Sequence, residues 1–126
     1  IVPAFMWIAD VNAIVHLRAI PVLAEIDETF NLDPKDLVQR ISPRTKAIIA
    51  IHMAGTAADM PAILAVADQH GIPVLEDCSQ AAGATIDGRM VGSMGRASSM
   101  GSANGKQFVL GITQKSKWFC REGIRI

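Results

Sequence analysis

The chain contains an acid, an amide and a lysine whose types and spacing could do amine chemistry. Asp77 ends the apolar segment 73–77, Gln80 follows shortly after it, and Lys106 stands between Gly105 and Gln107. A lysine amine can form a Schiff base with the aldehyde of pyridoxal phosphate (PLP), while a buried carboxylate can keep the pyridine nitrogen of that cofactor protonated. The three residues therefore predict a PLP site and a reaction of the amine-transfer type.

Each candidate also has a simpler interpretation. An aspartate at a strand end often only caps a helix or forms a turn, and a lone lysine is most often a solvated surface residue. His52 could face the same pocket, although a hydrogen-bonded structural histidine is the more common case at such a position. We expect His16, on a predicted helix, and His70, near a helix end, to lie on the surface.

Strand-like and helix-like segments alternate along the chain, which predicts an α/β fold. Short apolar runs predict strands, and apolar residues at helical spacing predict helices. Asp33-Pro34 is typical of a helix start, and Gly71 of a helix end. The expected strands are 1–5, 21–26, 46–52, 74–77 and about 98–102, and the expected helices are 8–19, 35–41 and 58–70.

This alternation predicts a mostly parallel sheet with flanking helices and right-handed crossovers. Ligands of open α/β sheets bind outside the carboxyl ends of the strands. Asp77, His52 and Trp7 all fall at or just beyond such ends. A short strand near 98–102 would bring Lys106 back towards the same edge, so the sheet could gather the motif residues at one site.

The composition argues against several other function classes. Lys plus Arg and Asp plus Glu each number 12, so no net charge favours nucleic acid or an acidic membrane surface. No apolar run approaches the ~20 residues that span a bilayer, and the first residues lack a signal-peptide pattern, so we expect a cytoplasmic protein. Cys78 and Cys120 fit neither a disulfide framework nor a metal-binding pattern, and we expect reduced thiols and no metal site.

The motif residues also resemble a known family. Segments 44–55, 58–60 and 71–84 are similar to the DegT/DnrJ/StrS family of PLP-dependent sugar aminotransferases. The most specific part is Glu76-Asp77-x-x-Gln80, followed by Lys106 at the family's usual distance. The resemblance extends from Ile1 to about Gly111.

The resemblance implies a role for each site residue. Lys106 would be the catalytic Schiff-base lysine, and Asp77 would be the partner of the pyridine nitrogen. Gln80 would be a hydrogen-bond partner near the phenolic oxygen of the cofactor. Trp7 matches the family position whose ring stacks on the cofactor, an ordinary core aromatic being the alternative. Ser102 is the candidate phosphate ligand, and a turn-forming serine is the alternative there.

The resemblance further implies fold and activity. Residues 1–111 would be part of the large PLP-binding domain of an aspartate aminotransferase-like enzyme, with 112–126 as an atypical tail that reflects a reading-frame change or an unrelated terminus. The enzyme would move an amino group from an amino acid such as glutamate to a keto sugar, nucleotide-linked or a related cyclitol, as a homodimer. We expect the chain to be a piece of that longer enzyme, and the alternative is a truncated, non-catalytic α/β fragment.

Overall fold

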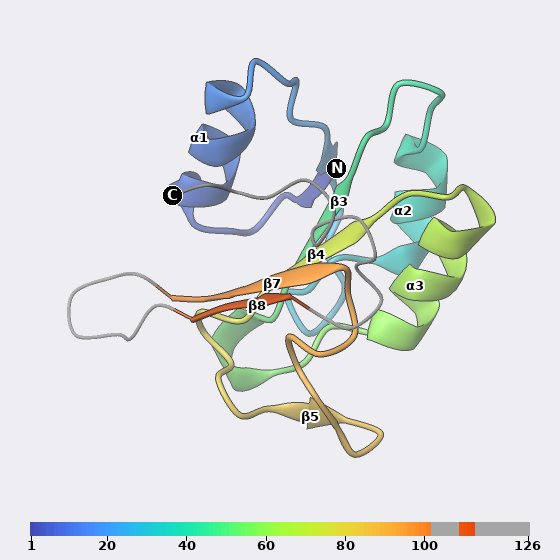
Figure 1. The fold of residues 1–126 in the computed structure, drawn as a ribbon. Coiled ribbons are helices and arrows are strands. Elements are labelled where there is room, and N and C mark those ends of the chain that lie inside the picture. Colours follow the sequence, from blue (N-terminus) through green and yellow to red (C-terminus); the bar gives the residue numbers. More distant parts are fainter. Residues whose placement is uncertain (102–108, 113–126) are drawn as a thin grey trace.

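A parallel sheet with helices on both faces organises the chain, as the alternation of segments predicts. The computed structural model describes residues 1–101 and the strand 109–112. Strands β3 (Ile48–Ile51), β4 (Val74–Asp77) and β7 (Ala97–Met100) are parallel neighbours, and β8 (Val109–Ile112) adds to β7 in the antiparallel direction. Figure 1 shows β3, β4, β7 and β8 side by side. The three central strands therefore end at the same edge of the sheet.

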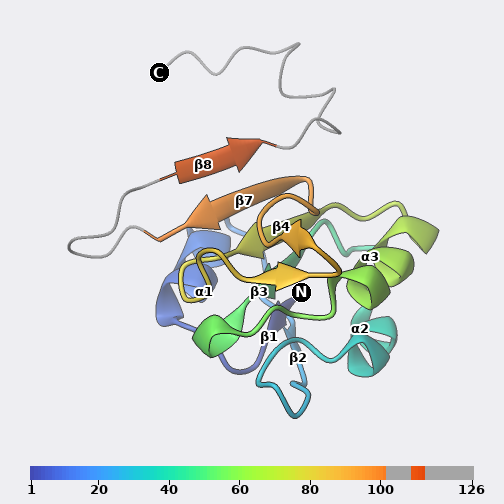
Figure 2. The same ribbon diagram turned by 90° about the horizontal axis from the view of Figure 1, so that it is seen from below.

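The first βαβ unit extends this sheet at β3. Strand β1 (Val2–Pro3) pairs in parallel with β2 (Leu23–Ala24), and helix α1 (Ile8–His16) connects them. The Ile49 N–H donates to the Ile1 carbonyl at 2.9 Å, so β1 lies beside β3. Helix α1 covers the sheet face opposite to the other two helices, as the view in Figure 2 makes plain.

Helices α2 (Pro34–Arg40) and α3 (Met60–Gln69) begin at side-chain caps that the sequence provides. The Asp33 carboxylate accepts from the Lys35 N–H at 2.8 Å, and the Asp59 carboxylate accepts from the Ala62 N–H at 3.0 Å. Such caps contribute ~1 kcal/mol each, because they satisfy amides that have no partner in the first helical turn. Helix α3 ends at Gln69, and Gly71 follows its C-cap residue. Gly71 has a φ of +64°, a left-handed conformation that glycine adopts without strain.

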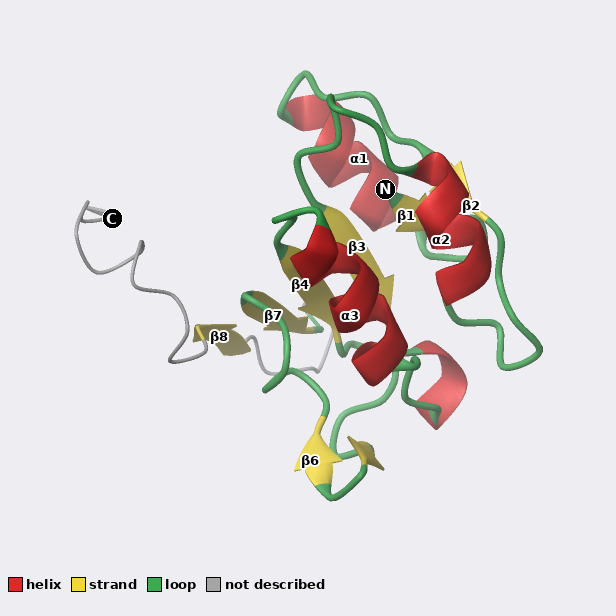
Figure 3. Cartoon of the chain, turned by 90° about the vertical axis from the view of Figure 1, so that its right-hand side faces the viewer, coloured by secondary structure: helices red, strands yellow, loops and turns green. Residues whose placement is uncertain are grey.

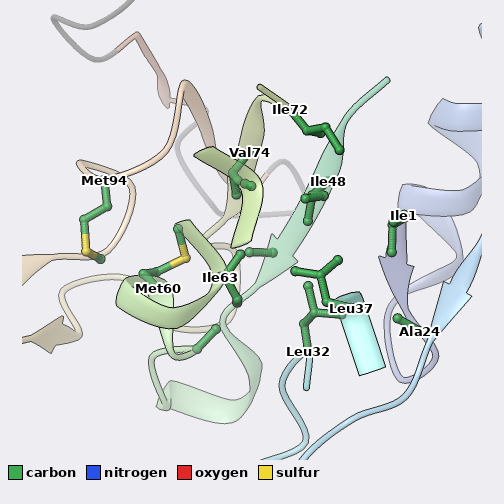
Figure 4. Close-up of a cluster of buried hydrophobic side chains, with 13 residues drawn as sticks. Ile1, Ala24, Leu32, Leu37, Ile48, Met60, Ile63, Ile72, Val74 and Met94 are labelled. Atoms are coloured by element: carbon green, nitrogen blue, oxygen red, sulfur yellow. The ribbon is translucent and has the colours of Figure 1, made fainter. Parts of the chain in front are cut away.

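The main core lies between these two helices and the sheet. Leu37 of α2 and Ile63 of α3 pack towards Ile48 of β3 and Val74 of β4, and all four are buried (Figure 4). Figure 3 shows α3 in front of β3 and β4. Each such side chain contributes ~1.5–3 kcal/mol by leaving water. A smaller cluster of Val2, Ile51 and Met53 lies on the α1 face.

Two local elements connect the strands near the expected site. A 3-10 turn (Met53–Gly55) follows β3, and Ala54 within it has a φ of +50°. A two-stranded hairpin, β5 (Thr85–Ile86) with β6 (Arg89–Met90), separates β4 from β7 and turns at Asp87-Gly88, both with positive φ. An Asp-Gly dipeptide favours the tight turn that matches the twist of paired strands. It is therefore a sequence signal for this hairpin, which was not among the expected elements.

Several predicted helices and strands are longer than those in the structure. The helix expected over 8–19 ends at His16, because Arg18 adopts a φ of +56° and the chain turns back. The strands expected over 1–5, 21–26 and 46–52 shorten to 2–3, 23–24 and 48–51, and that expected over 98–102 lies at 97–100. The helices expected over 35–41 and 58–70 are 34–40 and 60–69. Apolar side chains beyond these limits continue the hydrophobic pattern without continuing the backbone pairing.

Candidate functional site

Asp77 lies where the sequence places it, at the carboxyl end of β4. It pairs with Ile51 of β3 on one side and Ser99 of β7 on the other. Its Oδ1 accepts from the Ser79 N–H at 3.0 Å and also from the Ser79 hydroxyl. Oδ1 of Asp77 therefore stabilises a turn, as the turn-forming interpretation expects. Oδ2 has no hydrogen-bond partner among the described residues, which leaves it to bind a donor.

A cavity of about 170 Å³ lies between α1 and the sheet, and Asp77 lines it. Ile49 and Leu75 give it an apolar wall, and Ser99 and Asp10 add polar groups. Ligand pockets usually measure ~300–1,000 Å³, so this cavity is smaller than a typical ligand pocket. A carboxylate beside an apolar wall fits the protonated nitrogen of a pyridine ring, because a poorly hydrated site strengthens the pairing of opposite charges.

Asp10, in the first turn of α1, is a second acid in this cavity that sequence reasoning missed. Burial, and to a smaller extent the charge of Asp77, raise the pKa of its carboxyl to about 6. Two carboxylates that share a cavity repel each other when both are ionised. The cavity is thus better suited to a cationic ligand than to a neutral one.

Gln80 is fixed beside the 3-10 turn. Its backbone carbonyl accepts from the Gly55 N–H at 3.0 Å, and its side-chain Oε1 accepts from the Ala54 N–H at 3.3 Å. These bonds hold the turn in the left-handed conformation of Ala54. The side-chain NH₂ of Gln80 makes no hydrogen bond with the described residues, so it can donate to a ligand oxygen.

Trp7 precedes α1 as its N-cap residue and leaves 70% of its surface exposed. The core-aromatic alternative for Trp7 is therefore wrong. Trp7 does not line the cavity beside Asp77, so its stacking role stays a prediction. Lys106 and Ser102 lie outside the described residues, and so does Cys120.

The end of β7 is tied to the Asp77 turn. The Gly101 N–H donates to Ser79 Oγ at 2.9 Å, and the Cys78 N–H donates to the Ser99 carbonyl at 2.8 Å. Ser79 thus contacts Asp77 and the last described residue before Ser102. Gly101, at the end of β7, therefore lies beside the Asp77 turn.

The opposite sheet face carries a buried acid–histidine pair. His52 Nε2 lies 3.1 Å from Glu76 Oε2, and both side chains are fully buried. The Ala58 N–H donates to His52 Nδ1 at 3.0 Å, so the ring proton lies on Nε2 and is donated to Glu76. His52 is therefore the hydrogen-bonded structural residue that we expected. His16 and His70 are exposed, also as expected.

Burial raises the pKa of Glu76, but the bond from His52 and three backbone amides outweigh it and hold the pKa below its usual value. Cys78 lies within reach of this pair, and the three donor atoms are within 4.8 Å of one another. Burial and the charges of Glu76 and Asp77 raise the pKa of the Cys78 thiol to about 12. A thiol that stays protonated and a carboxylate that already accepts four hydrogen bonds form a poor metal site.

Within the described part of the chain, no helix combines the length and apolar character needed to cross a membrane.

The pattern of strands and helices resembles that of several known enzymes. The sequence profile of the DegT/DnrJ/EryC1/StrS aminotransferase family matches residues 1–112.

Two curated proteins match closely in sequence. An L-glutamine:2-deoxy-scyllo-inosose aminotransferase of Streptoalloteichus tenebrarius is 47% identical over 96 residues, which cover 75% of this chain and 23% of that protein. A UDP-N-acetyl-3-dehydro-alpha-D-glucosamine 3-aminotransferase of Acidithiobacillus ferrooxidans is also 47% identical over 96 residues, 75% of this chain and 26% of that protein. The chain therefore spans about a quarter of the length of these relatives.

A solved structure agrees with the sequence matches. An aminotransferase from Psychrobacter cryohalolentis superimposes with a TM-score of 0.84 at 33% identity, over 93% of this chain and 32% of that chain. The fold is thus part of the large domain of PLP-dependent aminotransferases, as the sequence resemblance implied.

Proposed function

Because the chain belongs to the DegT/DnrJ/EryC1/StrS aminotransferase family, we propose that it forms part of a PLP-dependent aminotransferase that acts on a keto sugar or a related cyclitol. The family match over residues 1–112 carries this proposal. Residues 1–111 supply part of the PLP-binding domain, and Ile112, which pairs with Ala97, belongs to the same sheet. The activity belongs to the protein encoded by the complete coding sequence, and the non-catalytic fragment remains the alternative for residues 1–126 alone.

Bound PLP supplies an electron sink and carries the amino group between the two substrates. Asp77 holds the proton on the pyridine nitrogen through Oδ2, while Ser79 fixes the carboxylate through Oδ1. Asp10 adds negative charge to the same cavity and favours the protonated nitrogen. Gln80 donates its side-chain NH₂ to the phenolic oxygen and so orients the ring.

The family resemblance supports the remaining roles. Lys106 would hold the cofactor through its aldehyde, and its amine would serve as the acid–base group for proton transfer. Trp7 would stack on the cofactor ring. Ser102 holds the phosphate, and its neighbour Gly101 is tethered to Ser79 close to Asp77.

The names of the relatives support the substrate class. One acts on 2-deoxy-scyllo-inosose with glutamine, and another on a dehydro derivative of UDP-N-acetylglucosamine. We therefore propose an amino acid donor such as glutamate or glutamine, a keto sugar or cyclitol acceptor, and a role in amino sugar biosynthesis. A cytoplasmic homodimer that requires neither nucleic acid nor a membrane is part of the same proposal.

Visible absorbance tests this function directly. The product of the complete coding sequence, incubated with PLP and freed of excess cofactor, should show the visible band of a lysine-bound cofactor. Glutamate or glutamine should convert that band to the near-ultraviolet band of the aminated cofactor, since the amino group passes to PLP. Lys106→Ala should not form the first band.

Lys46→Ala, in a segment before β3, is the matched control and should behave like the unsubstituted protein. Asp77→Asn should bind cofactor but convert it at least ~100-fold more slowly, because an amide cannot hold the pyridine proton. An unsubstituted protein that binds no PLP would refute the proposal.

A further inference from the structure

Glu76 receives an unusual number of hydrogen bonds for one side chain. Oε2 accepts from the Gly92 N–H at 2.7 Å and from His52 Nε2 at 3.1 Å. Oε1 accepts from the Met94 N–H at 2.8 Å and also from the Gly95 N–H. Three backbone amides of one loop thus point at a single carboxylate that is 1% exposed. A buried carboxylate with this many donors is held ionised and fixed in place.

The loop that supplies these amides leads directly into β7. The Arg96 N–H donates to the Val74 carbonyl at 2.7 Å, and the next residue, Ala97, begins β7. Glu76 therefore anchors the entry of β7 to β4, the strand that carries Asp77. The far end of β7 holds Gly101, which contacts the Ser79 turn. Both ends of β7 are thus fixed relative to the acid of the candidate cofactor site.

The loop fits closely around the carboxylate. A Cβ added at Gly95 would lie 2.8 Å from the Val74 carbonyl oxygen and 3.1 Å from Glu76 Cγ. A Cβ added at Gly92, whose φ is +84°, would lie 3.0 Å from Cys78 Sγ. Glycine at both positions therefore allows the backbone amides to reach Glu76. This close packing leaves no room for the loop to shift while keeping its hydrogen bonds.

Alternation along β4 separates Glu76 from Asp77. Successive side chains of a strand point to opposite faces, so Asp77 lines the cavity on the α1 side while Glu76 meets the loop and His52 on the α3 side. Glu76 also borders this cavity, but both of its carboxylate oxygens are engaged by the loop and His52. Any effect of Glu76 on the reaction must pass through the placement of β4 and β7.

We propose that Glu76, with His52 as its partner, is a positioning residue for the cofactor site: its carboxylate fixes β7, whose Ser99 lines the cavity, relative to Asp77. This inference rests on the proposed function for its catalytic meaning. The negative charge is essential to the role. A glutamine at this position has one oxygen and one NH₂, and in either orientation its NH₂ would meet at least one backbone N–H of the loop.

Hydrogen exchange and a PLP titration test the two halves of the proposal on the product of the complete coding sequence. In Glu76→Gln, the amides of Gly92, Met94 and Gly95 should exchange roughly tenfold faster or more, because they lose a charged acceptor. The apparent Kd for PLP, read from visible absorbance, should rise roughly tenfold under conditions where circular dichroism shows the variant fully folded. Gly95→Ala should produce the same pair of changes from the loop side.

Two controls separate positioning from general stability. Glu28→Gln removes an exposed carboxylate and should change neither measurement. Leu37→Ala creates a cavity in the core of α2, far along the sheet from Asp77, and should lower the melting temperature without changing the Kd for PLP.

The outcomes are distinct. Unchanged amide exchange in Glu76→Gln would refute the anchoring of the loop. Faster exchange with an unchanged Kd for PLP would show that Glu76 is a purely structural residue. An equal rise of the Kd in Leu37→Ala would show the same. Absence of PLP binding by the unsubstituted protein would refute the proposed function and the cofactor half of this inference. The exchange measurement would still decide the anchoring in that case.

Discussion

The carboxyl of Asp10 should make the stability of the folded state depend on pH. The pKa of this carboxyl is raised by burial and by Asp77 from its ordinary value of 3.8 to about 6. Between these two pH values the folded state holds this proton more tightly than the unfolded state. Stability contributed by the protonated form is therefore present below about pH 3.8 and lost as the pH rises through about 6.

Asp10→Asn should consequently stabilise the apo protein at pH 7 and above by about 1–2 kcal/mol. The gain should shrink towards pH 4 and vanish well below pH 3.8, where the unsubstituted carboxyl is protonated in both states. Denaturant unfolding at several pH values measures the difference. Asp68→Asn, on the exposed side of α3, is the control and should show no such trend. An equal effect of Asp10→Asn at pH 4 and pH 7 would contradict this explanation.

Glu76 should have the opposite pH signature. Its pKa is held below its ordinary value of 4.5, so its contribution to stability is present above pH 4.5 and lost as the pH falls through the lowered pKa. Glu76→Gln should lower the free energy of unfolding by about 2–4 kcal/mol at pH 7, since it disrupts a buried charged network. The difference from the unsubstituted protein should shrink in acid, as urea unfolding between pH 3 and 7 can show. A constant difference across this range would contradict the role of the charge.

Ser79 links the end of strand β4 to the end of strand β7. Its hydroxyl donates to Asp77 and accepts from the Gly101 N–H at 2.9 Å, which joins the ends of β4 and β7. Ser79→Ala should weaken PLP binding by the full-length protein about fivefold to tenfold, because the Asp77 carboxylate and the end of β7 both lose an anchor. Equilibrium titration monitored by visible absorbance measures the change.

Ser93→Ala is the matched control, because Ser93 is exposed and bonds only to the Met90 carbonyl at 2.6 Å among the described residues. It should leave the affinity for PLP unchanged. Equal effects of the two variants would show that the hydroxyl of Ser79 does not position the site.

The order of elements could be predicted from sequence because local signals mark it. Apolar runs identified β3 and β4, and Asp33-Pro34 and Gly71 marked helix ends that the structure confirms. The position of Asp77 followed, since its strand and the carboxyl edge of the sheet are set by these local patterns. Helix and strand ends were less accurate, because apolar side chains continue past the last paired residue.

The pairings around Asp10 and Glu76 could not be predicted in the same way. Asp10 meets Asp77 only because α1 packs over the β4 end, and Glu76 meets Gly92–Gly95 only because the chain returns after the β5–β6 hairpin. Nothing in the local spacing of an acid indicates which distant amides it will accept from. These contacts follow from the tertiary arrangement, so only the structure reveals them.

At the scale of the whole molecule, α1 has an exposed apolar side. None of its residues is buried, and Ile8 and Val15 of the helix, with Leu17 and Ile20 beyond it, are each more than half exposed. A surface of this kind promotes association in water. The 126-residue chain expressed alone should therefore self-associate in size-exclusion chromatography with light scattering. A monodisperse monomer with a cooperative thermal transition would contradict this expectation.

The central claim is that Lys106 and Asp77 belong to one PLP site. Borohydride reduction of the full-length protein with PLP, followed by peptide mapping, tests it most directly, because reduction makes the lysine–cofactor bond permanent. We predict one label per chain, on Lys106, and loss of that label in Lys106→Ala. Label spread over Lys35, Lys46, Lys115 and Lys117, with none favoured at Lys106, would contradict the assignment of this chain to a functional cofactor site.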